Sequence, residues 1–582
     1  MKYRWTQHSI KAESNIPALS VALNHLPEPL VRALIARGID DLEKAKDFFR
    51  GSLDQLHDPF LMHEMQAAAE RLAHAAAQQE CVMVYGDYDV DGTTATAMMT
   101  EYLRSIGCTA HYFIPDRMVD GYGLGTRGLD EAKSRGCSLV VALDCGITAL
   151  EAGDYASEIG LDLIICDHHT ALETRPTALA VLDPKQAACT YPFDELCGCG
   201  VGFKLIQATN ALLDRPIYDA WKYLDLVALA TTSDIVPLQD ENRILLREGL
   251  KRLSQGDRPG IRALADRAGV TLRAVSVRDI GFGMGPRINA AGRMKQATLA
   301  VDLLLEEDPD KALKLADRLE QANVERQGKD RAAAADAVTR VERMITASET
   351  HGLVVYGEDW HPGIIGIVAS RVVERFYRPC AVLCSVQGEI KGSVRSIEGI
   401  NIYDALEHCK EHLIQFGGHM YAAGLTMREE HIAAFRAAFN EAVGRQITAE
   451  VLTPVLTYDA EVTASELTDR FWAVLKQFGP HGPENAEPIF RLREVTLNSM
   501  PKPMGKTGDH LRLELTTGLD AHMKAVGFRL GKALPMVQEA FTQQWPLDLL
   551  VSLSENTWRG RTTLEMRIHD IQRSDADAKG AR

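Results

Sequence analysis

Short runs of valine, isoleucine and leucine that alternate with helical stretches constrain the fold more than any other feature of this chain. The runs are CVMVYGD, AHYFIPD, SLVVALDCG, DLIICDHH and LAVLDP. Continuous apolar strands separated by helical segments predict a parallel sheet that is covered by helices on both faces. Each run reaches an aspartate, and ligands of such sheets gather at the carboxyl ends of the strands. We therefore expect an α/β domain with a functional site at one edge of its sheet.

The rest of the chain divides into segments with different periodicities. Residues 1–75 carry apolar residues at three- and four-residue spacing, which predicts a helical segment, and the α/β domain should then span 76–307. Residues 308–346 contain one glycine and, after Pro309, no proline, which predicts a long connecting helix that leads to a smaller α/β domain over 347–446. Residues 450–572 alternate like strands and contain turn signals, which is typical of a small β-barrel. The polar residues 573–582 are expected to form a disordered tail.

Composition narrows the class of protein only slightly. No apolar run approaches the ~20 residues of a membrane span, and the first residues lack the apolar centre of a signal peptide, so we expect a cytoplasmic protein. The 11 cysteines, several of them in apolar runs, suggest buried, reduced thiols. Cys197 and Cys199 are too closely spaced for the usual zinc pair and are expected in a structural turn. A net charge of −16 argues mildly against a polyanionic partner, although a local cleft can still be positive.

Acidic and imidazole side chains follow four separate strand-like or apolar segments. The candidate ligands are Asp87, Asp89, Asp91, Asp144, Asp167, His168, His169 and Asp234. A lone aspartate after a strand is usually a helix cap or a turn residue. Four segments that all present such groups are better explained by shared cations, because unpaired buried carboxylates are costly.

The kind of cation follows from the ligand types. The first three aspartates resemble the start of a calcium loop, but Met98 stands where that loop needs a glutamate. Oxygen ligands with one or two imidazoles suit Mn²⁺ or Mg²⁺, and there are more of them than one ion needs. Two such ions ~3.5–4 Å apart are the usual arrangement for phosphoryl transfer. The sequence therefore predicts a phosphoesterase with two Mn²⁺ or Mg²⁺ ions per active site.

Longer motifs relate the chain to a known family. DYDVDG, LDCG, CDHH and ATTSDIVPL resemble the four successive motifs of the DHH phosphoesterase superfamily, and FGGHMYAAGL resembles the motif of its companion domain, DHHA1. GFGMGPRINAAGRM is similar to a motif of the RecJ exonucleases, and FGPHGPENAEPIF and ENTWRGRTTLEMRIHDI resemble their carboxy-terminal OB-fold. The resemblance runs from about residue 15 to 572. It implies a parallel-sheet DHH domain, a long helix, a smaller DHHA1 domain and an OB-fold.

The resemblance also implies roles for individual residues. Asp89 and Asp144 would bind one metal, with Asp87 as a ligand or just behind the ligands. The other metal would be bound by Asp91, Asp144, His168 and Asp234, so that Asp144 bridges the two. His169 would face the scissile phosphate, and Asp167 would orient an imidazole. Tyr85 replaces a histidine found in related pyrophosphatases, which leaves the ligand set of the first metal open.

The companion domain is expected to hold the substrate. Arginine and serine side chains in glycine-rich loops are what a terminal phosphate requires. The resemblance places in this role Arg287, Asn289, Arg293, Ser370, Arg371, Arg395, Ser396 and His419. In the OB-fold, Trp558, Arg559 and Arg561 are candidates for a surface that binds single strands.

The implied activity is that of a single-stranded-DNA-specific 5′→3′ exonuclease that releases 5′-mononucleotides in DNA recombination and repair. The implied partners are a single-strand-binding protein and a helicase, and we expect a monomer. One alternative is a nano-RNA or small-nucleotide phosphodiesterase, against which the β-barrel and Phe416, a glycine in such enzymes, both argue. The other is a non-catalytic DNA-binding scaffold, which predicts broken ligand motifs, whereas all of the motifs are intact.

Overall fold

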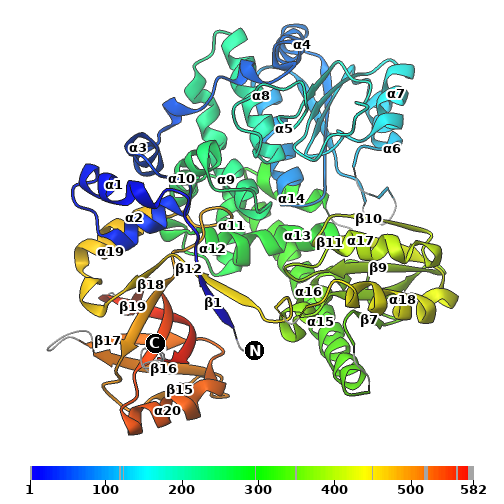
Figure 1. Cartoon of the computed structure of the whole chain (residues 1–582). Coiled ribbons are helices and arrows are strands. Elements are labelled where there is room, and N and C mark those ends of the chain that lie inside the picture. Colours follow the sequence, from blue (N-terminus) through cyan, green and yellow to red (C-terminus); the bar gives the residue numbers. More distant parts are fainter. Residues whose placement is uncertain are drawn as a thin grey trace. The chain divides into compact units, whose positions relative to one another are not determined.

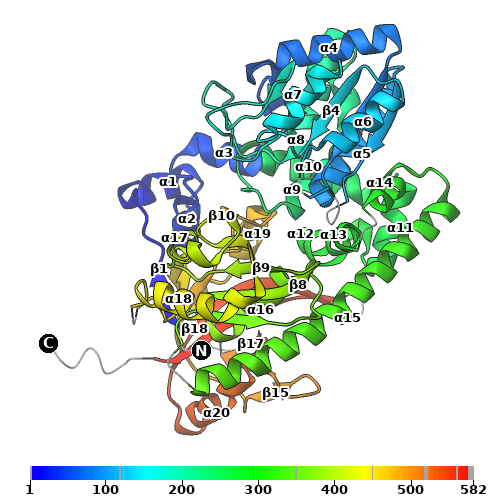
Figure 2. The same ribbon diagram turned by 90° about the vertical axis from the view of Figure 1, so that its right-hand side faces the viewer.

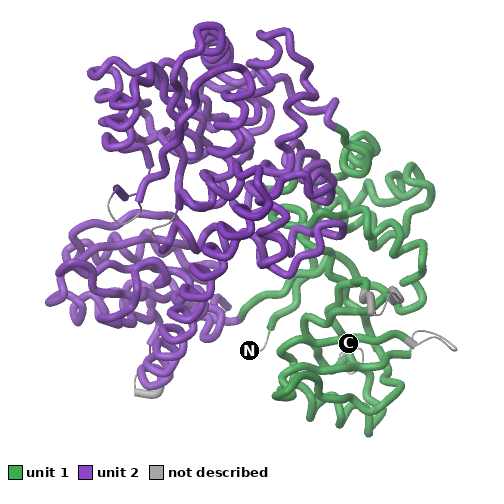
Figure 3. Tube along the Cα trace, turned by 180° about the vertical axis from the view of Figure 1, so that it is seen from behind, with its two compact units in different colours: residues 1–52, 237–239, 454–582 green, residues 53–236, 240–453 purple. Residues whose placement is uncertain are grey.

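The computed structural model describes residues 3–116, 120–121, 123–294, 297–347, 350–448, 450–516, 522–558 and 561–574. Two compact units are formed by these residues, and each contains segments distant in sequence (Figure 3). Unit 1 consists of residues 1–52, 237–239 and 454–582, and unit 2 of residues 53–236 and 240–453.

The first lobe of unit 2 contains the predicted parallel sheet. Its strand order is β3-β2-β4-β5-β6, and all neighbours are parallel. The strands are β2 (Cys81–Gly86), β3 (Thr109–Phe113), β4 (Leu139–Leu143), β5 (Asp162–Cys166) and β6 (Ala180–Leu182). Every residue of β4 is buried, as expected for a central strand covered on both faces.

Helices cover both faces of this sheet (Figure 1). One face packs against α4 (Met65–Gln78), α5 (Val90–Ser105) and α8 (Gly198–Leu212), and the other against α6 (Thr126–Ser134) and α7 (Leu150–Glu158). Further helices complete the lobe: α9 (Leu224–Ser233), α10 (Asp240–Gln255), α11 (Pro259–Ala268), α12 (Val277–Asp279), α13 (Gly285–Arg293) and α14 (Thr298–Leu305).

The long helix α15 (Pro309–Ala347) leads to the second lobe of unit 2 (Figure 2). Its mixed sheet has the order β10-β11-β9-β8-β7, made of β7 (Leu353–Tyr356), β8 (Cys380–Val386), β9 (Glu389–Arg395), β10 (Gln415–Gly418) and β11 (Ala422–Met427). The end of α15 and α16 (Ile365–Phe376) share one apolar cluster with the sheet. A second cluster joins the sheet to α17 (Ile402–His408) and α18 (Ile432–Gly444).

Unit 1 is built on a seven-stranded mixed sheet. Its order is β13-β14-β18-β19-β17-β16-β15, made of β13 (Ala460–Val462), β14 (Phe490–Val495), β15 (Lys502–Met504), β16 (His510–Thr516), β17 (His522–Gly527), β18 (Leu547–Trp558) and β19 (Arg561–Arg573). The helices of its carboxy-terminal part are α19 (Asp469–Leu475) and α20 (Leu534–Gln543).

The beginning of the chain belongs to this same unit. Strand β1 (Arg4–Gln7) pairs in parallel with β12 (Val455–Tyr458). The helices α1 (Ile16–Ala22), α2 (Glu28–Ile35) and α3 (Leu42–Arg50) share an apolar cluster with the seven-stranded sheet, in which Leu30 and Leu34 are buried together with Phe471 and Phe490. The helical segment expected over 1–75 is therefore divided: residues 1–52 fold with unit 1, and α4 packs on α8 in unit 2.

Three smaller expectations can be compared with the structure. Arg573 ends β19 and the hydroxyl of Ser574 donates to buried Asp548, so the disordered tail predicted from residue 573 begins too early; residues 575–582 lie outside the described residues. All 11 cysteines are free thiols, and nine of them are buried. Among the described residues, no helix is long and apolar enough to cross a membrane.

Candidate active site

The loop between β2 and α5 gathers the first three aspartates. Asp89 is the N-cap of α5, and its carboxylate accepts a hydrogen bond of 3.1 Å from the backbone N–H of Gly92. A Cβ at Gly92 would lie 2.5 Å from the carbonyl oxygen of Asp87, so only glycine permits this close turn. Asp87 and Asp91 are both 1% exposed. The capping role that a lone aspartate usually has thus falls to Asp89, and Asp91 lies in the first buried turn of α5.

The N-terminus of α8 holds Asp91 in place. The backbone N–H groups of Gly198 and Cys199 donate to its two carboxylate oxygens at 2.6 and 2.7 Å. Free N–H groups and the helix dipole make such a terminus a good binding site for an anion. A Cβ at Gly198 would lie 2.6 Å from Cβ of Asp144, so this position also requires glycine. The expected structural turn at Cys197 is instead the start of a helix that contributes to the site, and the closely spaced glycines of CGCGVG were the signal for it.

Asp144 lies at the centre of the cluster. It directly follows β4, is 2% exposed and has a left-handed backbone with φ of 59°. A non-glycine residue in this conformation is strained, and such strain is concentrated at functional sites. Burial and the charges of Asp91 and Asp89 raise the pKa of Asp144 well above its ordinary value.

The pKa values of two other acids of the cluster are also raised. Burial and the charge of Asp89 raise the pKa of Asp91 to about 7. Burial and the charge of Asp91 raise the pKa of Asp234 to about 8. The cluster therefore cannot hold all its negative charges near neutral pH unless cations are bound.

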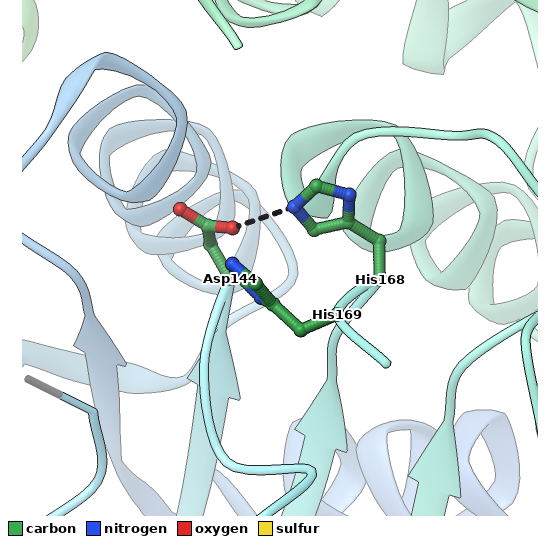
Figure 4. A group of neighbouring side chains, drawn as sticks. All are labelled: Asp144, His168 and His169. Carbon is green, nitrogen blue, oxygen red and sulfur yellow. Dashed lines mark ion pairs between the residues drawn. The ribbon is translucent and has the colours of Figure 1, made fainter. Parts of the chain in front are cut away.

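The two histidines after β5 point toward Asp144 (Figure 4). Nε2 of His168 lies 3.2 Å from Asp144 Oδ1, 3.5 Å from Asp234 Oδ2 and 3.8 Å from Asp91 Oδ2. Burial and the neighbouring His169 lower the pKa of His168 to about 3. The ring is therefore neutral at physiological pH, which is the form that binds metal ions.

Asp167 fixes the second histidine. Its Oδ1 accepts from Nδ1 of His169 at 2.7 Å, and its Oδ2 accepts from the N–H of Ile147 at 2.9 Å. Burial alone would lower the pKa of His169, but the Asp167 carboxylate raises it to about 9. The side chain of His169 is 42% exposed. The ring of His169 is therefore held by Asp167 while part of it stays open to solvent.

The ligand atoms form three overlapping groups, each with all atoms within 4.8 Å of one another: Asp87, Asp89 and Asp144; Asp91, His168 and Asp234; and Asp144, His168 and His169. Within the described part of the chain, neither Oδ1 of Asp144 nor either ring nitrogen of His168 has a hydrogen-bond partner. Buried polar atoms are rarely left so, and carboxylate and imidazole ligands suit Mn²⁺ and Mg²⁺. The residues present therefore fit two divalent cations that share Asp144.

Helix α13 connects this cluster to the second lobe. Oδ1 of Asn289 accepts a hydrogen bond of 3.2 Å from the N–H of Val90, next to Asp89. One turn later, Nη1 of Arg293 donates to the carbonyl oxygen of Gly363 at 2.8 Å. These two predicted substrate residues thus lie between the metal loop and the segment that leads into α16.

Arg287, on the same helix, is placed differently. Its guanidinium donates to the carbonyl oxygens of Gly283 and Arg267 at 2.7 and 2.9 Å, and Nε lies 2.5 Å from Glu320 of α15. These contacts hold α13 against α11 and α15. They do not bring Arg287 to the metal cluster.

The remaining predicted substrate residues lie in the second lobe. Arg371 forms an ion pair of 2.6 Å with buried Asp330 of α15. The hydroxyl groups of Ser370 and Ser396 donate to the carbonyl oxygens of Gly366 and Ile400. Other predicted residues lie on the sheet: Arg395 ends β9, and His419 follows β10 and is exposed.

Arg395 is held by its own strand and lies beside the start of α16. Its Nη1 donates to the hydroxyl of Ser393 and to the carbonyl oxygen of Val394, at 3.0 and 2.8 Å. Burial lowers the pKa of Arg395. A Cβ at Gly366 would lie 3.1 Å from Nη2 of Arg395, so the guanidinium packs directly on the first turn of α16.

The candidates of the OB-fold cannot be placed. Arg559 lies outside the described residues, and the side chains of Trp558 and Arg561 are likewise not described.

Comparison with known proteins connects this geometry to a family. The DHH family, N-terminal domain, matches residues 81–231, the DHHA1 domain matches residues 349–445, and the RecJ OB domain matches residues 458–570. The single-stranded-DNA-specific exonuclease RecJ of Bacillus subtilis (strain 168) is 35% identical over 553 residues, which cover 95% of this chain and 69% of that protein. The chain belongs to the RecJ family.

Solved structures of the RecJ family have the same fold. The crystal structure of RecJ in complex with Mn²⁺ from Thermus thermophilus superposes with a TM-score of 0.83 at 29% identity, covering 98% of this chain and 80% of that one. The Mg²⁺ complex from the same organism has a TM-score of 0.77 at 28% identity, with 98% and 79% covered. The predicted α/β architecture with DHH, DHHA1 and OB domains is thereby confirmed.

Proposed function

We propose that this member of the RecJ family is a single-stranded-DNA-specific 5′→3′ exonuclease that uses two Mn²⁺ or Mg²⁺ ions. The observation that carries the proposal is the meeting of two ligand groups, Asp87–Asp89–Asp144 and Asp91–His168–Asp234, around Asp144. The solved relatives are complexes with Mn²⁺ and with Mg²⁺, and the curated relatives are named single-stranded-DNA-specific exonucleases.

The proposed reaction balances as a simple hydrolysis. One water is added to the phosphodiester that follows the 5′-terminal nucleotide, and the bond between phosphorus and the 3′ oxygen breaks. A 5′-mononucleotide leaves with a free 3′ hydroxyl, and the shortened strand keeps the 5′ phosphate for the next cycle. Two divalent cations, when bound, supply the charge that stabilises the transferring phosphate and activates water.

The side chains divide the remaining work. Asp87, Asp89, Asp91, Asp144, His168 and Asp234 hold the cations. His169, oriented by Asp167, donates a hydrogen bond to the scissile phosphate. Arg395, His419 and Arg371 bind phosphates of the strand, with Ser370 and Ser396 shaping that surface, and Asn289, Arg293 and Arg287 hold α13 between the two lobes.

The test uses a 3′-labelled single strand with a 5′ phosphate, incubated with wild type and Asp144→Ala in Mn²⁺, Mg²⁺ or EDTA. A duplex and a dinucleotide serve as parallel substrates. We expect progressive shortening of the single strand from its 5′ end, abolished by EDTA and by the substitution. Cleavage confined to the dinucleotide would instead favour a small-nucleotide phosphodiesterase, and binding without cleavage in either metal would favour a non-catalytic scaffold.

We further propose a cytoplasmic monomer that works in recombination and repair with a single-strand-binding protein and a helicase. The free thiols favour a reducing compartment, and degradation of a single strand requires that another activity open the duplex. Light scattering of the purified chain would test the monomer. Affinity capture with purified single-strand-binding protein, with and without DNA, would test a direct contact.

A further inference from the structure

Phe282 is the most exposed of the large apolar side chains among the described residues, at 83%. It lies in a π-helical turn, Ile280–Met284, that runs directly into α13. The residues at both ends of the turn, Ile280 and Met284, are completely buried. The turn is therefore anchored in the core while Phe282 is held out toward solvent. Such π-helical turns are rare and are frequently found at functional sites.

The turn lies beside the metal cluster. It packs against α9, the helix that ends at Ser233 just before Asp234. A Cβ at Gly285, the residue that follows the turn, would lie 2.9 Å from Oγ of Ser233. Phe282 is only three residues, less than one helical turn, from that contact.

A second apolar side chain is exposed just after the end of α9. Ile235 directly follows Asp234, is 71% exposed and has φ of 62°. A β-branched residue in this region of φ is strained, so the surrounding structure must hold it there. We call Ile235 and Phe282 the apolar ledge. Helix α13, which continues from the turn with Phe282, is joined to the metal loop by the hydrogen bond from Val90 to Asn289.

We propose that the apolar ledge receives a nucleobase of the single strand, with Phe282 stacking on the face of the base and Ile235 supporting it. This inference rests on the proposed exonuclease function. Cations and arginines would bind the phosphates of the strand near the ledge. The bases present flat apolar faces, and an apolar side chain is needed to hold them. Stacking on an aromatic side chain accepts every base, which suits an enzyme that removes nucleotides one after another. In a duplex the base faces are already stacked on their neighbours, so the same contact favours single strands.

The test combines Phe282→Ala with substrates that lack a base. Strands carry one abasic residue at successive positions from the 5′ end, and kcat/KM is compared with that of the intact strand. We expect wild type to lose about tenfold at the contacted position, equivalent to ~1.4 kcal/mol. On the intact strand, kcat/KM of Phe282→Ala should be lower than that of wild type by a similar factor. Removing the base from the strand should then cause no further loss in this variant. Phe282→Trp should restore the sensitivity.

A matched control comes from the beginning of α9, the helix against which the π-helical turn packs. Tyr218 is 60% exposed and lies in the helical turn Ile217–Tyr223, directly before α9. Tyr218→Ala should behave like wild type on every strand. The inference is overturned if Phe282→Ala loses activity on intact and abasic strands by the same factor, because the variant then keeps the sensitivity of wild type to the missing base.

Binding separates this inference from the proposed function. The affinity for the same strands is measured in EDTA, where no hydrolysis occurs. A wild type that shortens no strand in any metal would refute the exonuclease proposal alone. The abasic effect on binding, present in wild type and absent in Phe282→Ala, would still support the ledge as a base-binding surface, and its absence in wild type would refute it.

Discussion

Replacing Asp144 by asparagine should stabilise the cation-free protein, although it removes the central residue of the site. The ligand oxygens of Asp87, Asp89 and Asp144 lie within 4.8 Å of one another. At an effective dielectric constant of ~20, two unit charges ~4.8 Å apart repel by ~3.5 kcal/mol. Asparagine at position 144 removes two such pairs, a repulsion of ~7 kcal/mol when all three carboxylates are charged.

Protonation of Asp144 reduces the repulsion that the asparagine variant would relieve. The raised pKa of Asp144 means that the wild type can bind a proton there and so avoid the repulsion. At a pH of ~7.5, protonating a carboxyl group with an ordinary pKa of ~3.9 costs ~5 kcal/mol. We therefore expect Asp144→Asn to be more stable than wild type in EDTA by ~1–5 kcal/mol.

Divalent cations should reverse the order. An ion present at ~100 times its dissociation constant stabilises the folded state by ~2.7 kcal/mol for each site. Asp144 belongs to two of the three ligand groups, so the asparagine variant should lose most of this gain. The assay is urea unfolding of both proteins in EDTA and in Mn²⁺, with the manganese content measured in parallel. We expect Asp144→Asn to be the more stable protein in EDTA and wild type to be the more stable protein in Mn²⁺.

Asp183 provides the control. It is completely buried just after β6, and burial raises its pKa to about 7, yet it belongs to none of the ligand groups among the described residues. Asp183→Asn should keep the full response to Mn²⁺. The reasoning is refuted if Asp144→Asn is less stable than wild type in EDTA, or if Mn²⁺ stabilises it as much as it stabilises wild type.

Three further predictions concern other parts of the molecule. His169→Ala should lower kcat by ~100-fold, as expected for a lost proton donor, while calorimetry shows little change in Mn²⁺ affinity. Arg395→Ala should raise KM about tenfold or more for strands with a 5′ phosphate and less for strands with a 5′ hydroxyl, because a charged hydrogen bond contributes ~1.5–3 kcal/mol. Asp548→Asn should destabilise unit 1 by ~2–4 kcal/mol in urea at neutral pH, because it breaks the ion pair of 2.6 Å between the buried Asp548 and the half-buried Arg491. Burial alone would raise the pKa of Asp548, but the hydroxyl of Ser574, a backbone N–H and Arg491 lower it. Its contribution is thus present above the unfolded pKa of ~3.9 and is lost as the pH falls through the lower folded pKa.

Each of these has an outcome that contradicts it. A loss of bound Mn²⁺ in His169→Ala would make that histidine a metal ligand instead of a proton donor. An equal effect of Arg395→Ala on both kinds of 5′ end would remove its role in phosphate recognition. A difference between Asp548→Asn and wild type that stays the same from neutral pH to ~pH 3 would mean that the charge of Asp548 does not stabilise unit 1.

Local patterns in the sequence determined the elements and their order. The helix expected over 308–346 is α15, Pro309–Ala347, because an uninterrupted stretch of helix-forming residues needs no distant partner to define it. The acids after β2, β4 and β5 meet because the carboxyl ends of parallel strands lie at one edge of the sheet. The sequence by itself therefore predicted that these acids and histidines gather in one cluster.

Only the tertiary structure decided which distant groups complete each site. Asp91 is held by the backbone of Gly198 and Cys199, more than a hundred residues away; the glycines of CGCGVG indicate a close approach there but do not identify the distant carboxylate. Arg287 has the motif of a substrate residue, but its donors face two carbonyl oxygens and Glu320.

The assignment of the first helices to a unit has the same cause. An amphipathic pattern shows that α2 has an apolar face, but it does not show which core that face will join. In the folded chain, Leu30 and Leu34 are buried with Phe471 and Phe490, more than four hundred residues later. Periodicity is a property of neighbours along the chain, whereas burial depends on which surfaces fit together in space, and that choice is made only when the whole chain folds.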